Sequence, residues 1–285
     1  MRWVFLIVYT LVGVVDADDT IRVATLNINA GISSPSNAVA AIKSSDADVV
    51  CLQEPNPQMM SNLTNALSGA YIYSKFDSPG HNYWYYIDRL GILSKHPFVA
   101  KFIAPTAEGA FGSQLAVVHI GTSDIQILNV HLAPPRLLSL QHPLRSLQEF
   151  VDSEGKRVAE IKSLLSLLNP DLPTIIAGDF NTLPVCQTIR TILDQGFTDT
   201  HLYDTNTPAS NTWNDEIEGV PLSARLDYIF CDSSFIPVTN GVVPCASSDH
   251  SLVFTELQTK KGKRQPSPGA YSNKAADDLV ENAQE

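Results

Sequence analysis

Side chains able to bind a metal or move a proton follow several apolar runs of this chain. They are three aspartates, one glutamate, two asparagines and two histidines: Asn27, Glu54, His131, Asp179, Asn181, Asp227, Asp249 and His250. Each alone is weak evidence, but the ends of neighbouring strands meet at one edge of a sheet, where the sites of α/β proteins form. Oxygen ligands with few sulfur ligands suit a hard cation such as Mg²⁺. A histidine beside a carboxylate can act as an acid or a base.

The apolar runs that would position these residues alternate with helical patterns. β-branched and apolar residues predict strands at Ile21–Asn27, Asp48–Gln53, Gly91–Lys95, Leu115–Ile120, Ile125–Leu132, Thr174–Gly178, Leu226–Cys231 and Leu252–Leu257. Helical spacing predicts helices at Pro35–Ser44, Gln58–Leu67, Glu154–Leu168 and Thr188–Gln195. This order predicts an α/β fold, a four-layered sandwich of two packed mixed β-sheets flanked by helices.

The two ends of the chain differ from its centre. Residues 1–17 have the pattern of a signal peptide, with Arg2 as the basic start, an apolar run from Val4 to Val15 and small residues up to Ala17. Residues 18–259 form the predicted domain, and residues 260–285 are polar and predicted to be a disordered tail. We therefore expect a secreted protein. No later segment is long and apolar enough to be predicted as transmembrane.

The four cysteines would meet an oxidising compartment after export. They are Cys51, Cys186, Cys231 and Cys245, and four cysteines allow three full pairings. Cys231 ends a predicted strand and Cys245 lies just before the loop that holds Asp249, so this is the pair that we expect to form a disulfide. The sequence gives no indication of the oligomeric state.

The charge of the chain limits its partners. The formal net charge is −11, which argues against a tight, metal-free nucleic-acid-binding module. It does not exclude a phosphate substrate, because bound divalent cations reverse the local field.

Eight short motifs give the chain a resemblance to a known superfamily. They are Thr25-Leu26-Asn27, Leu52-Gln53-Glu54, Gly91-Ile92-Leu93-Ser94-Lys95, Asn129-Val130-His131, Gly178-Asp179-Phe180-Asn181, Thr212-Trp213, Arg225-Leu226-Asp227-Tyr228-Ile229-Phe230 and Ser248-Asp249-His250. In number and order they resemble the endonuclease/exonuclease/phosphatase superfamily, which has the fold of deoxyribonuclease I. The resemblance extends from about Ile21 to Leu257. It implies a metal-dependent phosphoric ester hydrolase.

The resemblance also implies roles for the residues at the strand ends. Glu54 would be the main metal ligand, with Asn27 and Asp249 nearby, and the metal would be Mg²⁺, Mn²⁺ or Ca²⁺. His250 would activate water as the general base, and Asp227 would hold its ring. Asp179 and Asn181 would orient the nucleophile and a phosphate oxygen. His131 would stabilise or protonate an oxygen as negative charge develops there.

Within the superfamily, His131 indicates branches that include secreted deoxyribonucleases, sphingomyelinases and inositol-polyphosphate phosphatases. A local alignment places Asp88 as the partner of this histidine and Tyr86 at a groove-contacting position, and Arg225 is a further candidate for supporting the site or contacting substrate. Asn56 departs from the deoxyribonuclease pattern, which has an arginine there. Asparagine brings no charge to the groove, so DNA binding should be weaker than in that branch. Because His131 supplies a second acid, we still expect a phosphodiester substrate, with nucleic acid favoured over lipid or inositol phosphate. The first alternative is a sphingomyelinase or inositol-phosphate phosphatase that uses the same site. The second alternative is a non-catalytic binding protein on the same fold.

Overall fold

The computed structural model describes residues 20–29, 34–77, 89–104, 112–134, 141–202 and 210–260. The described helices are α1 (Pro35–Ser45), α2 (Pro57–Leu67), α3 (Pro143–Ser166), α4 (Gln187–Asp194) and the short 3-10 helix η2 (Thr200–Leu202). The strands are β1 (Thr20–Asn27), β2 (Val49–Gln53), β3 (Tyr73–Asp77), β4 (Leu90–Ser94), β5 (Phe98–Ala104), β6 (Ser113–Ile120), β7 (Ser123–His131), β8 (Thr174–Asp179), β9 (Thr198–Asp199), β10 (Trp213–Ile217), β11 (Val220–Ala224), β12 (Asp227–Cys231), β13 (Phe235–Val243) and β14 (Leu252–Thr259).

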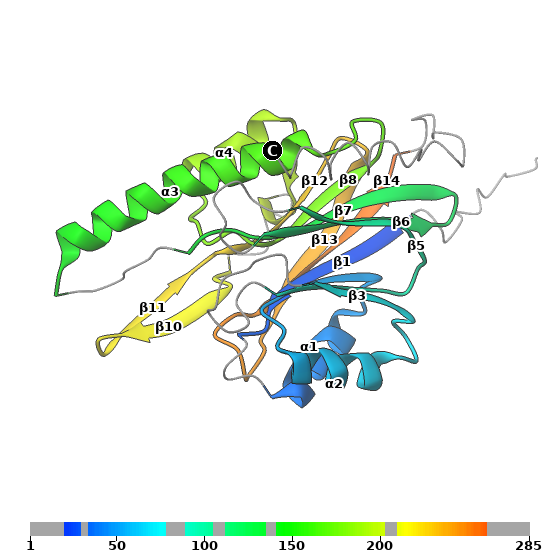
Figure 1. Ribbon diagram of the computed structural model, residues 1–285, viewed down its shortest axis with the longest axis horizontal. Helices are drawn as coiled ribbons and strands as arrows, with labels where there is room; N and C mark the ends of the chain where they lie inside the picture. Colours follow the sequence, from blue (N-terminus) through cyan, green and yellow to red (C-terminus); the bar gives the residue numbers. More distant parts are fainter. Residues whose placement is uncertain are drawn as a thin grey trace, which may run out of the picture.

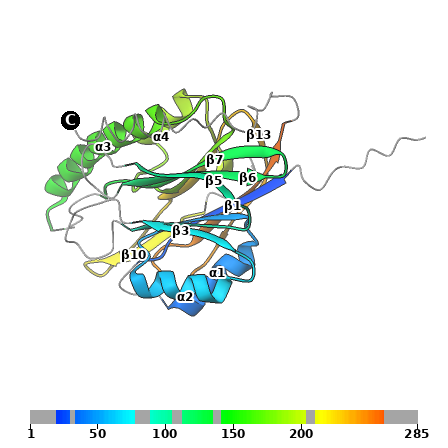
Figure 2. The same cartoon turned by 45° about the vertical axis from the view of Figure 1, so that its right-hand side comes forward.

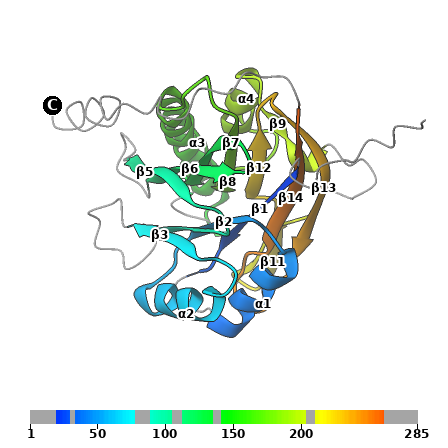
Figure 3. The same cartoon turned by 90° about the vertical axis from the view of Figure 1, so that its right-hand side faces the viewer.

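Two mixed six-stranded sheets pack face to face (Figure 1). The first sheet has the order β13-β14-β1-β2-β4-β3, and the second has the order β5-β6-β7-β8-β12-β9. Helices α1 and α2 cover the outer face of the first sheet, and α3 and α4 cover the outer face of the second (Figure 3). The predicted four-layered α/β sandwich is therefore confirmed.

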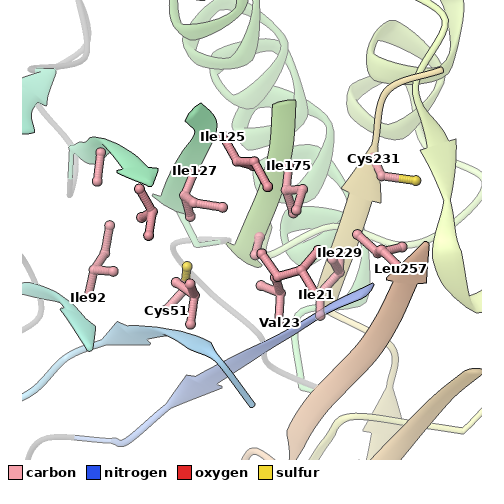
Figure 4. Packing of buried hydrophobic residues seen from close by; sticks show 14 of the residues in the cluster. Ile21, Val23, Cys51, Ile92, Ile125, Ile127, Ile175, Ile229, Cys231 and Leu257 are labelled. Carbon is pink, nitrogen blue, oxygen red and sulfur yellow. The ribbon is translucent and has the colours of Figure 1, made fainter. Parts of the chain in front are cut away.

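Apolar side chains from both sheets fill the space between them (Figure 4). Ile21 and Val23 of β1 meet Ile175 of β8 and Ile229 of β12 in one buried cluster. Residues of alternate parity on the same strands face the helices instead, as Ala24 and other β1 residues do against α1 and α2. The inner strands are therefore apolar on both faces, which explains their continuous apolar runs in the sequence.

The strand register brings the ends of the inner strands to one edge of the sandwich. β1 and β2 run parallel, with Asn27 opposite Gln53. β7 and β8 also run parallel, with His131 opposite Asp179, and antiparallel β12 begins with Asp227 opposite that same aspartate. One edge thus receives the carboxyl ends of four strands and the amino end of a fifth.

A buried polar contact fixes the two sheets relative to each other near this edge. Gln53 Nε2 on the first sheet donates to Asn129 Oδ1 on the second at 2.7 Å. Asn129 Nδ2 donates in turn to the backbone oxygens of Leu52 and Gly91, at 3.1 and 3.0 Å. Because a buried amide is costly to leave unpaired, these contacts favour one sliding position of the sheets.

The predicted strands and helices are present with shifts of one or two residues, except that α3 begins at Pro143, not at Glu154. The first half of α3 was missed because it is largely exposed, with Leu144 at 83%. Strands β3, β5, β9, β10, β11 and β13 were not predicted. The predicted signal peptide, and the tail beyond Lys260, lie outside the described residues.

The predicted Cys231–Cys245 disulfide is wrong, because all four cysteines are free. Cys231 lies in the core between the two sheets. Cys245 lies in the cluster that joins the first sheet to α1 and α2. The two thiols therefore pack into different layers of the sandwich.

Across the described ranges, no helix combines the length and apolar character needed to cross a membrane.

Candidate active site

A histidine and an aspartate from different strand ends form the centre of the site. His250 Nδ1, on the loop before β14, lies 2.8 Å from Oδ2 of Asp227 at the start of β12. Thr212 Oγ1 donates to the same aspartate oxygen at 2.6 Å, and itself accepts from the backbone N–H groups of Leu226 and Asp227. The imidazole orientation is therefore fixed through its Nδ1, which leaves Nε2 directed to the interior of the site.

Asp179 lies between this pair and a second histidine. His250 Nε2 is 3.7 Å and His131 Nε2 is 3.6 Å from Asp179 Oδ2. Asn27 Nδ2 donates to the same oxygen at 3.0 Å and to Glu54 Oε1 at 3.0 Å. His131 Nε2 is also 3.7 Å from Glu54 Oε1. The Asp179 carboxylate thus has neighbours from the ends of β1 and β7 and from the loop before β14, and Glu54 joins the group through Asn27 and His131.

Burial and charge shift the pKa values of two of these groups. Burial acts to lower the pKa of His250, but the charges of Asp227 and Asp179 outweigh it and raise this pKa to about 10. Burial raises the pKa of Asp179, and the charge of Asp227 adds to that effect while the two histidines oppose it. Shifted acid/base groups of this kind are typical of catalytic sites.

Three residues of the site have left-handed backbone conformations. The φ angles are 52° at Asn29, 58° at Glu54 and 50° at Asn181. Asparagine tolerates this region, whereas glutamate is strained in it. The strain at Glu54 places the carboxylate against Asn27 and His131, and backbone strain of this kind concentrates at functional sites.

Asn181 is held in place by the loops on both sides of it. Its backbone N–H donates to Asp179 Oδ1 at 2.9 Å, and its Nδ2 donates to the Leu132 oxygen at 3.0 Å. Gly178, with φ of 153°, allows this arrangement because a Cβ there would lie 2.0 Å from the backbone oxygen of Val130. β7 and β8 can therefore approach closely enough to bring His131 beside Asp179.

Asp249 is oriented by two neutral donors. Asn29 Nδ2 donates to its Oδ1 at 2.7 Å, and Trp213 Nε1 donates to its Oδ2 at 3.0 Å. Asn29 was missed by the sequence reasoning. Its spacing of two residues from Asn27 was the available signal, but asparagines are also common in loops for conformational reasons alone.

The other residues named from the sequence lie away from this centre or outside the described residues. Arg225 is buried, donates to both carboxylate oxygens of Asp199 at 3.2 and 2.6 Å, and lies over the Tyr228 ring. Its guanidinium therefore supports the start of β12. Asp88 and Tyr86 lie outside the described residues. Asn56 caps α2 by accepting from the Met59 N–H at 2.8 Å.

The residues fit a hard cation through their oxygen atoms. Glu54 and Asp179 both accept from Asn27 Nδ2, and both oxygens of Asp249 accept from neutral donors. Asp179, Asp227 and His250 also present ligand atoms within 4.8 Å of one another. Because His250 Nδ1 is already bonded to Asp227, this trio is better suited to moving protons. Oxygen ligands from Glu54, Asn27 and Asp249 match the chemistry of Mg²⁺ more closely.

The chain is a two-sheet sandwich with histidines and carboxylates gathered at one edge. The sequence model of the Endonuclease/Exonuclease/phosphatase family matches residues 24–250, and the chain belongs to this family. It is a phosphoric ester hydrolase, and the family depends on divalent metals. No curated protein matches the chain.

Solved structures of low sequence identity share the fold. An endonuclease/exonuclease/phosphatase from Beutenbergia cavernae DSM 12333 is 21% identical, with a TM-score of 0.65 over 85% of this chain and 72% of that one. A humanized D. rerio TDP2 with 14 mutations is 16% identical, with a TM-score of 0.63 over 85% and 100% of the two chains. A functionally unknown conserved protein from Enterococcus faecalis V583 is 16% identical, with a TM-score of 0.66 over 84% and 100%.

Proposed function

We propose that this protein is a secreted, divalent-metal-dependent phosphodiesterase, and that it acts as an endonuclease in which His250 activates water. The observation that carries the proposal is the geometry of His250, whose ring is held by Asp227 at 2.8 Å while its Nε2 faces Asp179 at 3.7 Å. This geometry suits a general base, because one nitrogen is fixed by a carboxylate and the other faces the site. The base form requires the His250 pKa to fall from about 10, and a cation bound beside these carboxylates would lower it.

The other residues act on the two oxygens that change during hydrolysis. His250 takes the proton of the attacking water, and Asp227 stabilises the imidazolium that forms. Asp179 and Asn181 orient the water and a phosphate oxygen. His131, whose Nε2 lies 3.6 Å from the same Asp179 Oδ2, stabilises or protonates the departing oxygen. A bound Mg²⁺, Mn²⁺ or Ca²⁺, held by Glu54, Asn27 and Asp249, would supply positive charge to the phosphate.

Nucleic acid is the substrate class that we favour, because His131 supplies a second acid for an alkoxide leaving group. The surface beside the site modifies this proposal. The β10–β11 hairpin leaves the site at Trp213 and extends outward (Figures 1 and 2). Its exposed Asp215, Glu216 and Glu218 are acidic and repel phosphates. Binding of a polyanion should therefore be weak and depend strongly on added cation.

One observation favours a lipid phosphodiester as a second candidate. The first half of α3 extends from the same end of the sandwich as the hairpin (Figures 1 and 2). Leu144, Leu147 and Val151 follow helical spacing on it and are 83%, 60% and 55% exposed. Such an exposed apolar stripe suits a lipid surface better than a polyanion.

A substrate panel tests these proposals. The mature protein, with added Mg²⁺, would be given supercoiled DNA, RNA, sphingomyelin vesicles, inositol polyphosphates and bis-p-nitrophenyl phosphate. We expect nicking of DNA that is suppressed by rising salt and lost in His250→Ala. His119→Ala is the matched control, because His119 is half exposed and bonds Asp124 at the far end of β7. Hydrolysis of sphingomyelin alone would replace the nuclease proposal by the lipid one.

Secretion has a separate test. The pattern of residues 1–17 supports cleavage before Asp18. Amino-terminal sequencing of protein recovered from the medium of expressing cells should start near this residue. Material that begins at Met1 would contradict the proposal.

A further inference from the structure

Helix α3 contains a charged cluster that is buried under the site. Arg157 and Glu160 are both 0% exposed, and Glu154 lies one helical turn before the arginine with its carboxylate 3.1 Å from Arg157 Nη2. A helix that covers a sheet ordinarily buries apolar residues against it, as α3 does with Ile161 and Leu164. Burying charges is costly, and a buried ion pair is weak evidence for added stability. The cluster therefore calls for another explanation.

Two of these side chains hold the peptide groups that follow His131. Arg157 Nη1 donates to the Ala133 oxygen at 2.9 Å, and the Ala133 N–H donates to Glu160 Oε2 at 3.0 Å. Leu132, between His131 and Ala133, donates its N–H to the Asp179 oxygen at 3.0 Å and accepts from Asn181 Nδ2. Ala133, which the α3 side chains hold, is therefore only two residues after His131 in the chain.

The third side chain holds the loop that follows Asn181. Glu154 accepts from Thr182 Oγ1 at 2.7 Å and from the Thr188 N–H at 2.7 Å. It also accepts from Arg157 Nε at 3.1 Å, which connects the two loops through one arginine. Burial acts to raise the pKa of Glu154, but these hydrogen bonds and the arginine charge outweigh it and lower the pKa. Glu154 is therefore ionised at neutral pH.

We propose that Arg157, together with Glu154 and Glu160, is a positioning residue of the reaction. The cluster fixes the loops after β7 and β8 against each other and so sets the placement of His131 and Asn181 around Asp179. The inference rests on the proposed function, since it concerns the same site. None of the three side chains touches the reacting atoms. Their effect is on turnover, through the residues that they hold.

Arg157→Lys tests the proposal, because it keeps the charge but loses the planar set of donors that reaches Ala133 and Glu154 together. With bis-p-nitrophenyl phosphate and Mg²⁺, we expect kcat to fall about 10- to 100-fold, as for other residues that orient active groups, with KM little changed. Arg22→Lys is the matched control. Arg22 forms an ion pair with Glu256, at the end of β1 opposite to the site. The same substitution there should weaken this ion pair and lower stability, and should leave kcat unchanged.

A double-mutant cycle with Asn181→Ala separates positioning from general stability. If Arg157 acts through Asn181, the additional kcat loss from Arg157→Lys should largely disappear in the Asn181→Ala protein. The same fractional loss in the wild-type, Asn181→Ala and His131→Ala backgrounds would overturn the proposal, as would an Arg157→Lys protein that loses stability but keeps kcat. If Arg157→Lys does not fold, Glu160→Gln, which keeps the shape and weakens the bond to Ala133, takes its place in the same cycle.

Amide hydrogen exchange provides a readout that does not need activity. Arg157→Lys should speed exchange at Ala133, and Glu154→Gln should speed exchange at Thr188, while the β1 and β2 amides stay protected. If exchange is unchanged at both sites, the proposal that these three side chains hold the loops after β7 and β8 is wrong. The wild-type protein could show these exchange effects and yet hydrolyse no phosphoric ester of the panel. In that case the proposed function is wrong, and the cluster still holds the two loops.

Discussion

The strained backbone at Glu54 leads to a prediction that separates stability from function. Glu54 has φ of 58° and directs its carboxylate at Asn27 and His131. Replacing it by alanine or by glycine removes the same carboxylate contacts. The two variants then differ only in whether a Cβ is present at a left-handed position. Both should lose turnover, because both lose a proposed metal ligand.

The expected stability difference follows from the backbone conformation. A left-handed conformation costs an L-residue about 1–2 kcal/mol, and glycine gives back about 0.4–1 kcal/mol through the greater freedom of its unfolded chain. Glu54→Gly should therefore be more stable than Glu54→Ala by about 1 kcal/mol. For a domain of this size the melting temperature should be higher by about 2–4 °C. Thermal unfolding in chelator, followed by circular dichroism, measures the difference.

Two further positions show whether the effect comes from φ. Glu218 has φ of 52° in the turn of the β10–β11 hairpin, so glycine should again be preferred to alanine there. Glu256 lies within β14, where glycine weakens a strand, so the order should reverse. If alanine at position 54 were as stable as glycine, the strain argument would be refuted, whatever happened to turnover.

Three other predictions concern the site and its support. In the cycle of His250→Ala and Asp227→Ala, the kcat losses should be strongly non-additive, because each residue acts through the other; additive losses would remove the pair as a unit. Gly178→Ala should destabilise the protein by more than about 1 kcal/mol, because its Cβ would meet the Val130 oxygen at 2.0 Å, and urea titration would show this. Chelation should abolish turnover while circular dichroism stays native, because the core is apolar and does not depend on metal; unfolding on chelation would contradict this.

The candidate site could be read from the sequence because its residues follow the best-defined strands. β1, β2, β7 and β8 are buried on both faces, so they appear as continuous apolar runs with clear ends. Asn27, Glu54, His131 and Asp179 are found by their place at or just after those ends. The parallel pairings then bring them to one edge without any further information.

The missed strands lack this signal for physical reasons. β10 and β11 form a hairpin whose residues are mostly exposed, so no apolar face repeats along them. β13 lies at an edge of the first sheet, contains Pro237 and Gly241, and has a register shift between Pro237 and Thr239. Edge strands tolerate proline and irregular pairing, and therefore resemble loops in sequence.

The contacts that support the site were not predictable, because they join residues far apart in the chain. Arg157 reaches Ala133 across 24 residues, and Asn29 reaches Asp249 across 220. In sequence, Arg157 and Glu160 are indistinguishable from the exposed charges of an ordinary helix. Only the packing of α3 onto the loops after β7 and β8 shows that they are buried.

The charge balance of the site gives a final prediction about pH. In chelator, the folded protein raises the pKa of His250 to about 10, from about 6.5 in an unfolded chain. A raised pKa means that the folded state binds the proton more tightly. Its contribution to stability is therefore complete below pH 6.5 and is lost as the pH rises through about 10. Asp179, whose pKa burial also raises, acts in the same direction at lower pH.

Removing the charge of Asp227 should lower the His250 pKa. In chelator, the Asp227→Asn protein should therefore lose less stability than the wild-type protein between pH 7 and 10. Urea titrations at a series of pH values measure this. An equal slope in the two proteins would show that Asp227 does not hold the proton on His250.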